Sequence, residues 1–173
     1  VSYDSRGWRN RVNAQNPLET LRQMAAGYCV SRSLHIVANL GVADSLDETP
    51  LTAAELAALV GAHPEALARV LRLLSGYGVF ESSDGKFRHS PASRMLRVDH
   101  PHSMRDFVRM FGLPPFWATL GEMEQSVRTG LPAGEKVIAG GLWAYFAEHA
   151  DANAIFNAAM GSKAQAHIAG VLA

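Results

Sequence analysis

Several marks of common protein classes are absent from this sequence. One cysteine, Cys29, in 173 residues excludes an internal disulfide and a cysteine-clustered zinc site. No apolar run approaches the roughly 18 residues that suggest a membrane-spanning helix, and residues 1–16 lack the apolar core of a signal peptide. Charge of one sign is not in excess, because 16 Lys and Arg residues balance 16 Asp and Glu residues. We therefore expect a cytoplasmic protein with no nucleic-acid partner and no membrane partner.

Signatures of catalysis and of metal binding are equally scarce. The sequence has no G-x-S-x-G motif of the kind that presents a nucleophilic serine. Gly76 and Gly78 begin a segment like a dinucleotide-binding loop, but the segment follows a predicted helix and ends in Glu81. His100 and His102 have a spacing found in metal sites, but no acid or cysteine lies at a matching interval. The sequence therefore predicts no catalytic residue, cofactor-binding residue or metal ligand in this chain.

What is present is the composition of a globular chain, with 48% hydrophobic and 18% charged residues. Its first predicted helix spans residues 17–40, because Asn16 is a suitable N-cap, Pro17 suits the first helical position and Gly41 is a C-terminal stop. The helix is apolar around most of its circumference and must therefore be buried on nearly all sides. A second subunit is the simplest cover, and a deep monomer core is the alternative. We predict a homodimer with contacts at Met24, Tyr28, Leu34, Val37 and Leu40.

The next stretch carries the pattern of two short helices and a hairpin. Thr52 and Glu55 are spaced as a capping box, and a second helix begins at Pro64 after a glycine stop. An Asp-Gly turn at Asp84 separates two short strand-like segments. This order predicts a winged helix, so the predicted fold class is mainly α with one small β-hairpin. A winged helix first suggests DNA binding, but residues 52–97 hold six basic against four acidic residues, a weak footprint for phosphates.

Beyond the hairpin, helical patterns cover residues 102–112 and 115–129, and the one long loop spans residues 130–141. A helical pattern in two pieces then runs from Leu142 to the end. Aromatic and methionine side chains concentrate in this part, as they do in pockets for flat apolar molecules. The pattern alone favours the ordinary core of a helix bundle, with a pocket as the alternative. The side chains are Met110, Phe111, Phe116, Trp117, Met123, Trp143, Phe146, Phe156 and Met160.

Several motifs stand in a fixed order along the chain. They are Ser31-Arg-Ser-Leu-His-Ile-Val-Ala-Asn-Leu-Gly41-Val-Ala-Asp44, Leu51-Thr-Ala-Ala-Glu-Leu-Ala, Gly78-Val-Phe-Glu, Trp117-Ala-Thr-Leu120, Ser126-Val-Arg-Thr-Gly130, Gly141-Leu-Trp143-Ala-Tyr-Phe146 and Phe156-Asn-Ala-Ala-Met160. The ordered set resembles the N-terminal dimerisation domain of caffeic-acid-type O-methyltransferases, a family that includes bacterial enzymes of natural-product biosynthesis. The resemblance covers residues 17–173 with no large gap.

The polar residues 1–16 read as an arm from their own sequence, ahead of the resemblance. The resemblance implies that residues 17–99 are the dimerisation helix with the winged helix and that residues 100–173 are a helical acceptor-pocket region. A C-terminal Rossmann-like domain, which would bind S-adenosylmethionine and supply the catalytic base, is expected to follow and to be missing from this chain. The whole enzyme is expected to methylate a hydroxyl of a small aromatic or polyketide-like natural product, and this chain alone is expected to be inactive.

The resemblance also implies a set of acceptor contacts. Phe156 and Met160 match positions that touch the aromatic acceptor, and Trp117 and Leu120 match the helix beside it. Phe111 is added because of its neighbourhood, and Lys163 falls where plant members carry a pocket histidine. Two other functions stay open: a stand-alone, non-catalytic dimeric module that binds a ligand, and a winged-helix transcription regulator.

Overall fold

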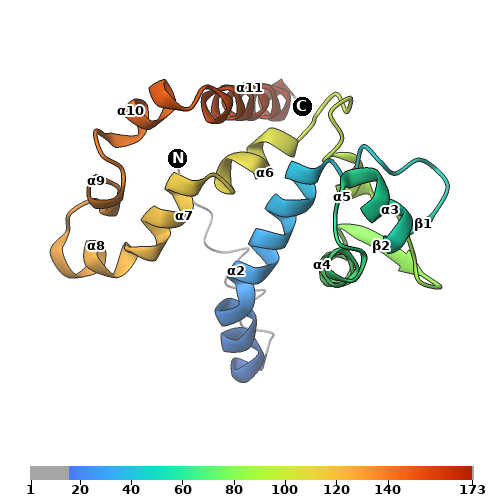
Figure 1. Ribbon diagram of the computed structural model, residues 1–173. Coiled ribbons are helices and arrows are strands. Elements are labelled where there is room, and N and C mark those ends of the chain that lie inside the picture. Colours follow the sequence, from blue (N-terminus) through green and yellow to red (C-terminus); the bar gives the residue numbers. More distant parts are fainter. Residues whose placement is uncertain (1–15, 173) are drawn as a thin grey trace.

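The computed structural model describes residues 16–172, with side chains as far as residue 161, so the predicted arm lies outside the described part except for Asn16. The chain is mainly α-helical with one small antiparallel sheet. The long helix α2, Pro17–Leu40, separates two groups of elements (Figure 1). The first group is β1 (Leu51–Thr52), α3 (Ala53–Val60), α4 (Pro64–Gly76), β2 (Phe80–Ser83), β3 (Lys86–His89) and α5 (Pro91–Arg94).

Helix α2 begins and ends where the sequence predicts. The Asn16 side chain accepts a hydrogen bond from the backbone N–H of Leu18 at 3.0 Å, and Gly41 closes the helix with a φ of 68°. The C-terminal half of the helix packs into the core. Val37 is 1% exposed there and Leu34 packs against the same core, so the prediction that Val37 contacts a second subunit is wrong. An all-round apolar pattern does not show which face of a helix its own chain covers.

The sheet has one strand more than the sequence predicts. The hairpin of β2 and β3 is present, and its turn places Asp84 and Gly85 at positive φ. The two residues of β1 pair antiparallel with β3, which gives the strand order β1-β3-β2. Two residues are too few to show alternation, so the pattern alone reveals only the hairpin. The predicted capping box is confirmed, since the backbone N–H of Thr52 donates to the Glu55 carboxylate at 2.7 Å and the Glu55 N–H donates to the Thr52 hydroxyl at 3.2 Å.

The core lies where the end of α2, the helices α3 and α4 and the sheet meet. Leu67, Leu71 and Leu74 lie on one face of α4, as the sequence predicts, and they are buried against α2 and the sheet. Each fully buried Leu or Phe side chain contributes about 1.5–3 kcal/mol to folding. The core is completed by Val37, Val42, Ala43, Leu46, Leu56, Ala57, Phe80, Phe87 and Leu96.

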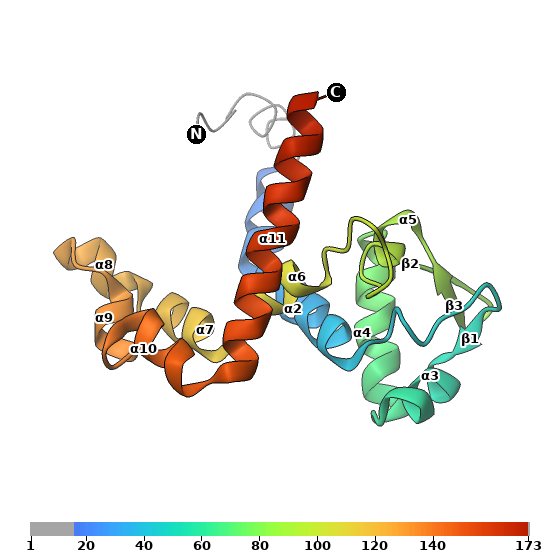
Figure 2. The ribbon, with the colours of Figure 1, turned by 90° about the horizontal axis from the view of Figure 1, so that it is seen from above.

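The second group of elements is more broken than predicted. The region expected as one helix at 115–129 divides at Glu122, directly after Gly121 ends α7, and glycine is a poor helix former. The expected loop at 130–141 contains a short helix. The final two-piece helix is confirmed, and its second piece packs against α6, beside which it lies in Figure 1 and over which it passes in Figure 2. The elements are α6 (Arg105–Phe111), α7 (Pro114–Gly121), α8 (Met123–Thr129), α9 (Ala133–Val137), α10 (Gly141–Glu148) and α11 (Ala150–Leu172).

Candidate functional site

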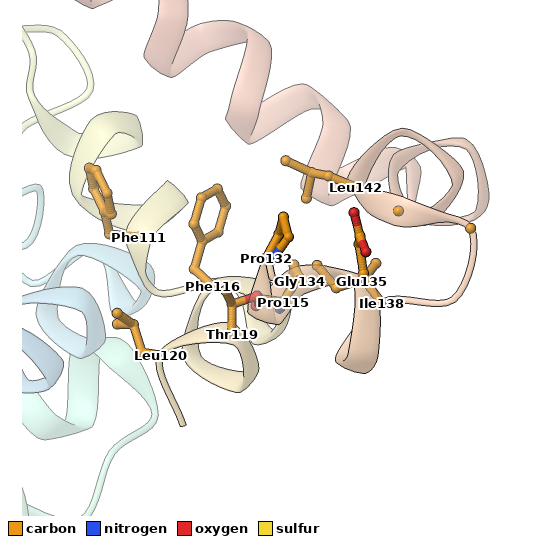
Figure 3. Close-up of a pocket in the computed structure, with 12 residues that line it drawn as sticks. Phe111, Pro115, Phe116, Thr119, Leu120, Pro132, Gly134, Glu135, Ile138 and Leu142 are labelled. Carbon is orange, nitrogen blue, oxygen red and sulfur yellow. Dashed lines mark hydrogen bonds between the residues drawn. The ribbon is translucent and has the colours of Figure 1, made fainter. Parts of the chain in front are cut away.

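A cavity of about 750 Å³ lies between α7, α9 and the start of α10 (Figure 3). Its walls are mostly apolar, and the volume falls in the range of small-molecule sites. The one carboxylate at its edge belongs to Glu135, on α9. The cavity is lined by Phe111, Pro115, Phe116, Thr119, Leu120, Pro132, Gly134, Glu135, Ile138, Gly140, Gly141 and Leu142.

Local sequence signals build these walls. Pro114 occupies the first turn of α7, with Leu113 extended before it, so the helix starts at a fixed point after α6. Gly140 and Gly141 have φ values of 72° and 80°, a backbone conformation that residues with a side chain rarely adopt. The two glycines turn the chain back so that α10 faces α9. Leu142 then points toward the side of the cavity that Phe116 also faces (Figure 3).

Phe111 and Phe116 form an aromatic wall of this cavity, and a third ring, that of Phe107, packs against Phe111. The Phe111 ring lies 5.9 Å from that of Phe116 and 5.2 Å from that of Phe107, the latter in an edge-to-face arrangement. The Thr119 hydroxyl donates to the Pro115 carbonyl at 2.8 Å, so its proton is already used within α7. The cavity therefore offers flat apolar contact rather than a set of polar catalytic groups.

A second cavity, of about 490 Å³, adjoins the first. It is formed between α2 and α7, and it shares Phe111 and Leu120 with the larger cavity. Its remaining lining residues are Gly27, Tyr28, Ser31, His35, Trp117 and Gly121. The dimerisation helix predicted from the sequence thus forms a wall beside the predicted acceptor region.

The rings of His35 and Trp117 meet at the second cavity with their centroids 5.7 Å apart, edge to face. The Arg32 guanidinium lies 5.4 Å from the Trp117 ring centroid and donates to the Gly112 carbonyl at 2.9 Å. Burial, and secondly the charge of Arg32, lower the pKa of His35 below its ordinary value. The imidazole is therefore held neutral at neutral pH.

The predicted acceptor residues do not all gather in one place. Phe111, Trp117 and Leu120 are brought together around the two cavities. Phe156 lies instead in a separate aromatic cluster, 4.8 Å from the Phe146 ring and 5.9 Å from the Trp143 ring. Met160 lies on α11, 36% exposed, and lines neither cavity; the side chain of Lys163 lies outside the described part. Contact of any of the six with an acceptor stays a prediction.

The six predicted acceptor contacts omit part of the cavity wall, although Phe116 is among the aromatic and methionine side chains for which the sequence leaves a pocket open. Phe116 and Thr119 share a face of α7 with Leu120, a spacing of three and four residues that points to a common surface. Ile138 and Leu142 had no such signal. They reach the cavity only because the glycine-rich stretch before α10 folds back, and sequence analysis treats that stretch as a loop.

The described residues contain no group of three His, Cys, Asp or Glu side chains placed to hold a metal ion. Among the helices of that same part, none is both long enough and apolar enough to cross a membrane.

Comparison with known proteins finds a matching domain and several relatives. Residues 22–99 match the O-methyltransferase dimerisation domain. The chain is 38% identical, over 87% of its length, to the phenazine O-methyltransferase PhzM of Lysobacter antibioticus, of which it covers 44%. It superposes on the crystal structure of LaPhzM with a TM-score of 0.83 and 36% identity, covering 91% of this chain and 48% of that one. It superposes on CalO1, a methyltransferase of calicheamicin biosynthesis in its SAH-bound form, with a TM-score of 0.78 and 34% identity, covering 88% and 46%. The chain thus spans less than half the length of the relatives it matches.

Proposed function

Because residues 22–99 match the O-methyltransferase dimerisation domain, we propose that the chain pairs subunits and binds the acceptor in such an enzyme. The enzyme would transfer a methyl group from S-adenosylmethionine to a hydroxyl of a small aromatic natural product. The matched proteins include a phenazine O-methyltransferase and an enzyme of calicheamicin biosynthesis, which supports that acceptor class.

The larger cavity carries the acceptor part of the proposal. A planar ring system would lie between Phe111 and Phe116 on one side and Ile138 and Leu142 on the other. These walls exclude water from the faces of the ring, and burial of apolar surface contributes about 25 cal/mol for each Å². Their task is to bind and orient, since an in-line transfer depends strongly on the position of the reacting atoms.

The described residues do not fit the methyl donor. The strands of the described part are β1, β2 and β3, all in one antiparallel sheet, and none is followed by a glycine-rich turn that opens a helix. We therefore assign no step of methyl transfer to residues 16–172. The donor would bind in another part of a longer protein.

The first half of α2 carries the subunit-pairing part of the proposal. Leu18, Leu21, Met24 and Tyr28 are spaced to lie along one face of the helix and are 72%, 69%, 62% and 64% exposed. We call these four residues the α2 stripe. A contiguous row of large apolar side chains is typical of a protein–protein contact. We propose that the α2 stripe packs against a second copy of the chain.

The acceptor proposal is tested by calorimetric titration of the chain with 1-hydroxyphenazine. Leu142→Trp fills the larger cavity and is expected to weaken binding at least about tenfold. The control is Leu131→Trp, at an exposed residue that lines neither cavity, and this variant should bind normally. Equal binding by both variants would refute an acceptor site in this cavity.

The product of the whole gene should also transfer radiolabelled methyl from S-adenosylmethionine to the hydroxyl of 1-hydroxyphenazine. No transfer to any hydroxylated phenazine or naphthoate would refute the proposed activity.

A further inference from the structure

Glu135 is the one charged residue that lines the larger cavity. The rest of the lining is apolar or glycine, apart from Thr119, whose hydroxyl donates within α7. Among the described residues, none donates a hydrogen bond to the Glu135 carboxylate or forms an ion pair with it. Glu135 is exposed, so water hydrates its carboxylate in the free chain and a ligand in the cavity can replace that water. In apolar pockets, a few polar groups of this kind fix the orientation and the specificity of the ligand.

The neighbouring charges leave Glu135 without a counter-charge. Residues 113–149, which span α7 to α10, contain two Lys and Arg residues and four Asp and Glu residues, although the whole chain is balanced. Both cations are already held by other carboxylates, each at 2.6 Å. The ion pairs are Lys136–Glu122 and Arg128–Glu124. The excess of negative charge around the cavity therefore attracts a cation and repels an anion.

Glu135 lies at the end of the cavity away from α2. Phe111 and Leu120 mark the end near α2, because they also line the second cavity, which α2 helps to form. Figure 3 shows Glu135 on the far side of Phe116 from these two residues, with its carboxylate on the side of α9 where Leu142 lies. A flat ring bound against Phe116 would therefore turn one edge toward Glu135. Apolar walls reduce the screening of a charge pair there, compared with a pair on an open surface.

We propose that Glu135 selects aromatic ligands that carry a positively charged nitrogen on the edge facing α9. An ammonium group or a protonated ring nitrogen donates to the carboxylate, and such charge-assisted hydrogen bonds are stronger than those between neutral groups. The inference rests on the proposed acceptor pocket, and it adds a feature of the ligand beyond the hydroxyl to be methylated. Ligands with a carboxylate on the same edge are disfavoured. Glu135 acts here in binding, as a residue that determines specificity.

The test compares three naphthalene probes of similar size and different charge. They are 1-naphthylmethylamine, a cation, 1-naphthalenemethanol, which is neutral, and 1-naphthoate, an anion. Binding is followed by NMR at the methyl resonances of Ile138 and Leu142, which line the cavity with Glu135 and are assigned by their loss in Ile138→Ala and Leu142→Ala. We expect the amine to bind about fivefold more tightly than the alcohol, and the naphthoate about fivefold more weakly. This spread should shrink when NaCl is raised from about 50 mM to about 500 mM, because salt screens exposed charges.

Glu135→Gln should give all three probes the affinity of the alcohol, and Glu135→Lys should reverse their order. The matched control is Glu148→Gln, which should keep the full spread. Glu148 is also an exposed carboxylate of the pocket helices that pairs with no described residue, but it lines neither cavity.

Equal affinities of the three probes for the unsubstituted chain, with both methyl resonances shifted, would overturn the role of Glu135 and leave the acceptor pocket intact. A spread that survives Glu135→Gln would overturn that role as well, and so would a loss of alcohol binding in this variant, since it would show a structural effect. If no probe shifts either resonance, the pocket and the inference are both overturned.

Discussion

At the scale of single residues, the buried imidazole of His89 joins three segments of the core. Its Nε2 lies 3.0 Å from the Leu46 carbonyl, to which it donates, so its Nδ1 accepts from the Ser93 hydroxyl at 2.9 Å. Burial is the main reason why the pKa of His89 lies below its ordinary value of 6.5; the charges of Arg94 and Arg97 act in the same direction, while the hydrogen bond to Leu46 opposes them. The folded chain therefore keeps this ring neutral.

This arrangement predicts the direction of a pH effect. The unfolded chain takes up a proton at His89 near pH 6.5 and the folded chain resists it, so stability falls as the pH drops below 6.5 toward the lowered folded value. His35 adds to the effect, because its pKa is also lowered. The free energy of unfolding, measured in urea, should fall between about pH 7.5 and about pH 5.5. The fall should be smaller in His89→Gln than in the exposed control His102→Gln. An equal loss in the two variants would contradict this account of His89.

A second prediction at this scale concerns the aromatic wall. Phe116→Ala removes one face of the proposed ring-binding space and should weaken binding of 1-hydroxyphenazine roughly tenfold, because a buried aromatic contact contributes more than about 1 kcal/mol. Met123→Ala, at a 57% exposed residue that lines neither cavity, is the control. Calorimetric affinities of the two variants decide the matter, and unchanged binding by Phe116→Ala would exclude that ring from the site.

At the scale of elements, α2 is one helix with two environments, and the two halves predict opposite mutant behaviour. Met24→Glu places a charge in the exposed α2 stripe and should raise the dimer dissociation constant at least about tenfold without lowering the thermal midpoint of the monomer. Val37→Asp places a charge in the core and should destabilise folding by several kcal/mol. Ala26 lies on the opposite side of α2 from Met24, so Ala26→Glu is the control for both variants and should change neither dimer affinity nor stability. Sedimentation velocity and thermal unfolding separate the outcomes; a Met24→Glu dimer of unchanged affinity would remove the stripe from the interface.

Local sequence patterns predict some elements well and others poorly. The start of α2, the capping box at Thr52 and the Asp-Gly turn at Asp84 each depend on a few neighbouring residues, so the sequence predicts them correctly. The strand β1 depends on its partner strand β3, and α9 is a single turn in a glycine-rich stretch, so neither has a local pattern long enough to detect. Which face of α2 is covered also depends on the other elements. The burial of Val37 is therefore not predictable from the pattern of its own helix.

The candidate site shows the same division between local and long-range information. Trp117 and Leu120 lie on α7 at helical spacing, and their resemblance to a family motif was enough to place them near a pocket. The meeting of His35 with Trp117 joins positions far apart in the chain, and the sequence shows His35 only as a single histidine on a predicted helix. The contact between the two rings appears only once α2 and α7 are placed side by side.

At the scale of the whole molecule, the buried core and the proposed pocket are in different places. The largest fully buried side chains, such as Leu56, Leu71 and Phe80, belong to the part built from α2 to α5, whereas the helices α7 to α10 bury few large side chains, with Phe146 the main exception. Local stability follows buried apolar contact, so the pocket helices should open more readily than the core. A binding region with this property can adjust around a ligand without unfolding the rest.

Native-state hydrogen exchange tests this difference. Amides of α4 near Leu71 should exchange only through global unfolding, and amides of α8 and α9 should exchange orders of magnitude faster through local opening. Bound 1-hydroxyphenazine should slow exchange in α7, α9 and α10, because it adds buried contacts at Phe116 and Leu142, and should leave the α4 amides limited by global unfolding. The cavity-filled variant Leu142→Trp should show no ligand-dependent protection. Uniform protection across α4 and α9 without ligand would mean that the chain unfolds as one cooperative unit and that the pocket is not separately mobile.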